Sequence, residues 1–344
     1  MINNIRNKFT TFLISLFSLV LFSCETNSLD TSNVEVNIQF KDFTKDIMEI
    51  KGEITPNHLL KLREEYGAFY DDYIGQIMRY GSPLSDTALR ALNYFKQDPH
   101  EQHLYKVVKL RFGDFTKQKK EILDGYRNYK YYFPEDTLRD VVTYISNFTM
   151  NINPVGDNYT GLSLEMYMGD TFTAYKVIKP ELPTFLHKLF TPSQVPIQNL
   201  KAIVNEKIRM NGGHKGRVLD EMVLWGKLFY ICEKVLPNSS IYEILGYDEE
   251  EWQWNKDNES EIWRFFIKDK KMFENMNNAN FKLFAEGPRT NYAGVPIDYC
   301  APMLGKFTGY QLISSYMENN ELSLEELVSN TDSDKILKLS GYKP

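Results

Sequence analysis

The chain has 344 residues, a formal net charge of −6 and an aromatic content of 14%. A negative net charge gives no sign of the basic surface that binds nucleic-acid phosphates, which argues against DNA or RNA as partners. Only three cysteines are present, so disulfide bonds do not build the fold. The length is enough for one large domain, or two closely packed ones, with a substantial core.

The N-terminus has the pattern of an export signal. Arg6 and Lys8 precede an apolar run, Phe12 to Phe22, which is too short to cross a bilayer but is typical of a secretory signal peptide. The run ends in Leu-Phe-Ser-Cys (21–24), which is similar to the lipobox of bacterial lipoproteins and makes Cys24 the expected lipidated residue. The alternative is an ordinary signal peptide with a chance cysteine.

These features divide the chain into three parts. Residues 1–23 are the expected signal peptide, and 24–33 are polar and without periodicity, as in a tether. Residues 34–344 form the expected folded domain.

The domain begins with a predicted strand at 34–40, where apolar and polar residues alternate. From about 55 to 132 the spacing of apolar residues predicts helices, with Thr55 as a cap and Pro56 in the first turn.

Two strand-forming segments follow, at 138–148 and 160–169, and the turn-forming run Asn-Pro-Val-Gly-Asp-Asn (153–158) separates them. Beyond Thr184 the pattern is helical almost throughout. We therefore expect an α+β fold with a small antiparallel sheet and a large helical half.

Several segments together resemble the gliding-motility lipoprotein GldB family of Bacteroidota, and the resemblance extends from Val34 to Pro344. The segments are GLSLEMYMG (161–169), VLDEMVLWGKLFYICEKVLP (218–237), NESEIWRFFI (258–267), GKFTGYQLISSYMENN (305–320) and ILKLSGYKP (336–344). The resemblance implies an envelope lipoprotein associated with gliding or with the linked secretion machinery.

That family is in turn similar to predicted zinc peptidases of the gluzincin kind, which implies a degenerate zincin-like fold. In such enzymes one helix carries His-Glu-x-x-His and a later helix carries the third ligand. Carried over to this chain, the first motif falls on Asn205, Glu206 and Arg209, and the second falls on Trp225.

The chemistry of these side chains argues against a zinc site. A catalytic zinc needs three protein donors. Asn205 offers a neutral amide, the guanidinium of Arg209 stays protonated, and the indole of Trp225 has no lone pair to donate. Glu206 then has no metal-bound water to activate, and an ordinary helix-face ion pair with Arg209 is expected instead. We therefore predict no metal and no cofactor.

A rearranged metal site of Glu206, His214 and Glu221 stays open as an alternative, although no spacing rule supports it. His100 and His103 are three residues apart, which does not match the protease spacing. No signature of a nucleophilic serine or cysteine is present, and no phosphate-binding loop.

These observations favour binding over catalysis. A peptidase scaffold without its metal keeps a groove in which an edge strand can align a peptide, and 160–169 is the candidate edge strand. Arg209, Trp225 and Tyr310 are candidates to line this groove, with packing in the core as the alternative for each.

The expected function is that of a non-catalytic envelope lipoprotein of the gliding-motility or linked secretion machinery. The expected partners are envelope proteins of such a complex, and the expected location is the outer membrane, lipid-anchored and facing the periplasm. Two alternatives are a hydrolase with an unconventional metal site and a nutrient-binding surface lipoprotein.

Overall fold

The computed structural model describes residues 29–149, 154–178, 181–212, 216–268, 270–292, 294–295 and 298–344. The chain divides into two compact units, Met1–Asn33 and Val34–Pro344. The expected signal peptide and Cys24 lie outside the described residues, and everything below concerns the second unit. Within the described residues, no helix combines the length and the apolar character needed to span a membrane.

The sheet has three short strands in the order β1-β2-β3, and both pairings are parallel. The strands are β1 (Phe40–Asp42), β2 (Asp140–Tyr144) and β3 (Tyr159–Ser163). The α+β prediction is confirmed, but the antiparallel arrangement was wrong. All of β3 and most of β2 are buried on both faces, as is usual for parallel strands.

The turn-forming run at 153–158 explains the error. It does reverse the chain, because Val155 forms an isolated antiparallel bridge with Thr160 and the Gly161 amide donates to the Pro154 carbonyl at 2.8 Å. The reversal therefore folds the segment before β3 back onto β3 itself. It does not join β3 to β2, which is reached by a longer connection.

The predicted edge strand is also shorter than expected. Of 160–169, only the part up to Ser163 is strand, and the chain then forms a 3-10 helix, η2 (Leu164–Tyr167). Although β3 is last in the sheet, the segment at 154–156 already pairs with Thr160 and Gly161. A peptide could not add to those paired positions of β3 without displacing this segment.

The helices before β2 are α2 (Phe43–Met48), α3 (Pro56–Tyr66), α4 (Ala68–Asp72), the π-helix η1 (Tyr73–Ile77), α5 (Asp86–Gln97), α6 (Pro99–Phe112) and α7 (Thr116–Tyr132). The buried side chains of α6 and α7 belong to the large core of the domain, whereas those of α2 to α5 form a smaller core against the sheet. Aromatic rings dominate this core: Phe43 and Phe69 pack in edge-on and tilted contacts with Tyr73 and Tyr144. Such contacts are favourable beyond simple area burial.

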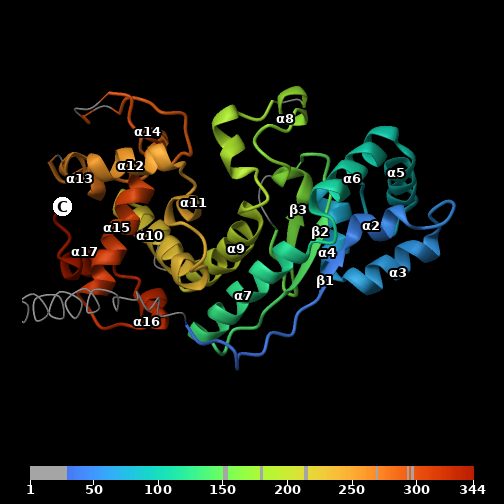
Figure 1. Ribbon diagram of the computed structural model, residues 1–344, viewed down its shortest axis with the longest axis horizontal. Helices are drawn as coiled ribbons and strands as arrows, with labels where there is room; N and C mark the ends of the chain where they lie inside the picture. The colour runs from blue at the N-terminus through green and yellow to red at the C-terminus, as the bar shows by residue number, and fades with distance from the viewer. Residues whose placement is uncertain are drawn as a thin grey trace, which may run out of the picture. The chain divides into compact units, whose positions relative to one another are not determined.

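The second half is nearly all helical. It contains α8 (Ala174–Val177), the 3-10 helix η3 (Thr184–Leu189), α9 (Gln194–Met210), α10 (Val218–Val235), α11 (Ile241–Leu245), α12 (Glu249–Asp257), α13 (Glu259–Lys268), the 3-10 helix η4 (Lys271–Phe273), α14 (Asn278–Phe281), α15 (Leu304–Glu318), α16 (Leu324–Ser329) and α17 (Ser333–Ser340). Helix α9 packs against β3, α7 and α10, so it lies between the sheet and the C-terminal helices (Figure 1).

Helices α10 and α15 approach each other unusually closely. A Cβ atom built on Gly226 would lie 2.1 Å from the Gly309 carbonyl oxygen, and one built on Gly309 would lie 2.1 Å from the Met222 carbonyl oxygen. Neither position has room for a side chain, so the two glycines set the distance between these helices. This contact fixes where Trp225, next to Gly226, and the N-terminal turn of α15 lie.

Candidate functional site

A pocket of about 840 Å³ lies between α9, α10, η2 and η3. Four of the five residues singled out from the sequence line it: Asn205, Glu206, Arg209 and Trp225. Apolar and aromatic side chains form most of the remaining wall, among them Met166, Tyr167, Leu186, Leu189, Phe190, Leu228 and Leu245.

One face of α9 supplies the polar part of the pocket. Lys201, Asn205 and Arg209 are spaced by four residues each, so they form one stripe along the helix. Leu200 and Val204 lie on the adjoining face and are buried in the core. The amphipathic pattern of α9 thus buries one face and turns the other toward the pocket.

The carboxylate of Glu206 forms an ion pair with a residue outside its own helix. Its Oε2 atom lies 2.6 Å from Nη1 of Arg139, which precedes β2. The expected pair with Arg209 was wrong, because the Arg209 Nε donates to the Asn205 Oδ1 at 3.1 Å instead. Asn205 and Arg209 therefore bond to each other, one helical turn apart.

Trp225 also has its polar atom satisfied. Its Nε1 donates to the Glu221 Oε1 at 2.9 Å, and its ring stacks on Phe229 with centroids 5.6 Å apart. The Nζ atom of Lys306, from α15, lies 4.1 Å from the centroid of the Trp225 ring. A cation over an indole face at this distance is a favourable contact.

Tyr310 is the one candidate that the structure does not bring to the pocket. It is largely buried between helices, where its hydroxyl donates to the Glu233 Oε1 at 3.0 Å and its ring packs edge-on against Trp252. Its surroundings match the core-packing alternative.

The described lining residues include neither histidine nor cysteine. Across the described part of the chain, no group of three or more His, Cys, Asp or Glu side chains is arranged to hold a metal ion. His214 of the alternative metal site lies outside the described residues. Within that alternative, Glu206 is bonded to Arg139 and Glu221 to Trp225.

Lys201 is the pocket residue that sequence reasoning missed. Burial, and then the nearby charge of Lys306, lower the pKa of the Lys201 ammonium to about 8. Its ammonium lies 5.3 Å from the centroid of the Phe229 ring. The available signal was its position four residues before Asn205, on the same stripe of α9.

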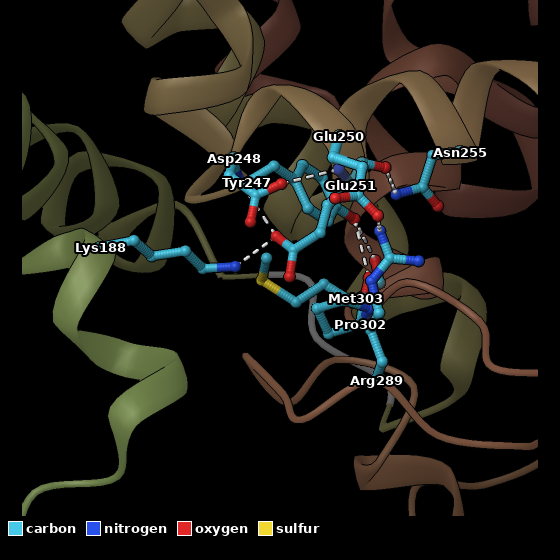
Figure 2. A network of polar contacts seen from close by, with 9 residues as sticks. All are labelled: Lys188, Tyr247, Asp248, Glu250, Glu251, Asn255, Arg289, Pro302 and Met303. Carbon is cyan, nitrogen blue, oxygen red and sulfur yellow. Dashed lines mark hydrogen bonds and ion pairs between the residues drawn. The ribbon is translucent and has the colours of Figure 1, made fainter.

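Helix η3, which forms part of the pocket wall, is joined to α12 by a polar contact (Figure 2). Lys188 lies between the wall residues Leu186 and Leu189 and forms an ion pair with Glu251 of α12. Glu251 also belongs to the capping box of α12, in which its backbone amide donates a hydrogen bond to the Asp248 Oδ1 at 2.8 Å.

The same network reaches the segment that precedes α15. The hydroxyl of Tyr247 donates to the carbonyls of Pro302 and Met303, at 3.1 and 3.0 Å, and Arg289 pairs with Glu250 at 3.1 Å (Figure 2). These contacts tie η3, α12 and the start of α15 together around one side of the pocket.

The fold and the site define a mostly helical α+β domain with a large, partly apolar pocket beside a short parallel sheet. Among known families, the model described as gliding motility protein GldB matches residues 24–344. The chain belongs to this family, which associates it with gliding motility. No curated protein and no solved structure matched the chain. The likeness to zinc peptidases stays a hypothesis.

Proposed function

We propose that this chain is a non-catalytic lipoprotein of the cell envelope, which serves gliding motility or the linked secretion machinery by binding a peptide or protein segment in the pocket on α9. Its lipid is attached at Cys24, and it faces the periplasm from the outer membrane. The expected partners are envelope proteins of the same machinery.

The observation that carries this proposal is the pairing of Glu206 with Arg139 at 2.6 Å. A general base must be free to take a proton from a water molecule or a substrate. Here the carboxylate is neutralised by a guanidinium, and its two helix neighbours, Asn205 and Arg209, bond to each other. Glu206 is therefore not placed to act as a general base.

The pocket itself suits binding. Its volume of about 840 Å³ lies in the range of ligand sites, and its apolar wall with a few polar groups on one face is the usual composition of such sites. Since β3 is already paired at Thr160 and Gly161, the bound segment is held mainly by side chains and not by strand addition.

Photo-crosslinking in cells tests the binding role. Met210 lines the pocket and is 79% exposed, whereas Leu110 of α6 is 87% exposed and away from it. A photo-reactive amino acid at Met210 is expected to give a defined adduct with an envelope protein, identified by mass spectrometry, and the same amino acid at Leu110 is not. Equal adducts from both positions, or none from Met210, would contradict the proposal.

Metal analysis and Glu206→Gln test the alternative of a hydrolase. We expect less than stoichiometric zinc in protein purified without chelators, and no hydrolytic activity for the substitution to remove. Bound zinc, together with a hydrolysis that Glu206→Gln abolishes, would reassign the chain as an enzyme.

A further inference from the structure

Lys201 on α9 lines the pocket. Its ammonium is near enough to that of Lys306, on α15 behind the pocket wall, for the two positive charges to act on each other. Lys306 is 4% exposed and has partners: the Trp225 ring at 4.1 Å and the Glu286 Oε1 at 3.4 Å. For Lys201, by contrast, no carboxylate of the described residues lies within 4.0 Å, and its ammonium lies over the Phe229 ring.

The cations in and beside the pocket differ in whether a carboxylate pairs with them. Arg139 is neutralised by Glu206, and Lys306 faces Glu286 and, at longer range, Glu221. Arg209 is exposed to solvent and bonds to a neutral amide. Lys201 has no carboxylate within ion-pair distance among the described residues, and Glu286 acts on it only at longer range. A positive charge held in a mainly apolar pocket is costly unless an anion compensates it. The lowered pKa of Lys201 has the same origin.

The other lining residues indicate which chemical groups the anionic ligand carries besides its negative charge. Most of the pocket wall is apolar, with Leu228 and Phe190 among its residues, so a ligand that fills the pocket carries an apolar group as well as a negative charge. Toward the other end of the stripe, Asn205 and Arg209 offer hydrogen-bonding groups that suit a polypeptide main chain.

We propose that Lys201 binds the terminal carboxylate of a peptide whose last residue is apolar. The inference rests on the proposed function, because it assumes that the pocket binds a peptide. The apolar side chain of the last residue lies against Leu228 and Phe190, the carboxylate lies at Lys201, and the chain leaves past Asn205 and Arg209. Lys306 is a positioning residue, which the Trp225 ring and Glu286 hold in place and which adds to the positive potential.

The test compares two peptide mixtures with fixed C-terminal phenylalanine and mixed residues before it. One mixture ends in a free carboxylate and the other in an amide. Binding to the mature lipidated protein in detergent is measured by fluorescence anisotropy. A charge-assisted contact predicts that the acid binds about tenfold or more tightly than the amide near neutral pH. This preference should weaken above pH 8, as Lys201 loses its proton.

Three variants make the assignment specific. Lys201→Met keeps the length of the side chain without its charge, and it should bind both mixtures equally. Lys201→Arg keeps the charge and should retain a preference for the acid. Lys176→Met changes an exposed lysine on α8 and should behave as the unchanged protein. Far-ultraviolet circular dichroism shows whether each variant is folded.

The outcomes separate this inference from the proposed function. If acid and amide bind equally, if neither binds, or if Lys201→Met keeps the preference, the carboxylate anchor is wrong. The proposed function is judged separately, by whether a photo-reactive group at Met210 captures an envelope protein.

Discussion

Two buried carboxyl groups near the ends of β2 and β3 show how single residues set the balance of charge. Glu165 of η2 is fully buried and accepts hydrogen bonds from the amide and hydroxyl of Ser146, at 2.7 and 2.8 Å. Glu101 of α6 has one carboxyl oxygen without a hydrogen-bond partner among the described residues. Burial, and then the charge of Glu165, raise the pKa of Glu101 to about 7.

This shift makes stability depend on pH. The folded chain holds the Glu101 proton to a higher pH than the unfolded chain does, so folding becomes less favourable as pH rises from the unfolded value near 4.5 to about 7. Glu101→Gln removes this loss. We expect its melting temperature to exceed that of the unchanged protein by about 1–3 °C near pH 8, with little difference near pH 5.

Calorimetry at the two pH values is the measurement. Glu64→Gln, at an exposed position of α3, is the control and should leave the curve unchanged. A gap between Glu101→Gln and the unchanged protein that is the same at both pH values would show that ionisation of Glu101 is not its cause.

At the scale of elements, the crossing of α10 and α15 is the contact on which the site depends most directly. Gly226 and Gly309 let the two helices touch through their backbones, which places Trp225 and Lys306 against each other. The glycine in Trp225-Gly226 was part of the family resemblance, but its packing role becomes visible only when α15 is in place.

Gly226→Ala is expected to separate these helices. The added carbon would lie 2.1 Å from a backbone oxygen, which cannot move aside as a side chain can. Overpacking of this kind costs about 3 kcal/mol or more of unfolding free energy. Gly75→Ala is the matched control, because its nearest neighbour is 3.9 Å away.

Urea denaturation measures both glycine variants. If Gly226→Ala lowers the free energy of unfolding by no more than Gly75→Ala does, then α10 and α15 can move apart without a large loss of stability. The tight crossing would then not be what positions Trp225.

For the whole molecule, the proposed lipid anchor at Cys24 precedes the compact unit Val34–Pro344 in the sequence. Cys24→Ser is expected to move the protein from the membrane fraction to the soluble envelope fraction, because the protein would then lack the acyl chains that hold it. Asn27→Ser, in the same tether, should leave it membrane-bound. Immunoblots of fractions washed with alkaline carbonate measure the distribution, and a membrane-bound Cys24→Ser protein would contradict lipid anchoring.

Local patterns in the chain were sufficient for most of its helices and for the α+β class, because helix formation depends on residues three and four apart. The unsuitability of Asn205, Arg209 and Trp225 as zinc ligands likewise follows from side-chain chemistry alone. The direction of the sheet did not follow, because the turn before β3 closes on β3 and strand pairing is a long-range choice. The same holds for the partner of Glu206 and for the approach of Lys306 to Lys201, because each joins residues far apart in the chain. Only the folded arrangement of α9, β2 and α15 decides which of these charges are neutralised.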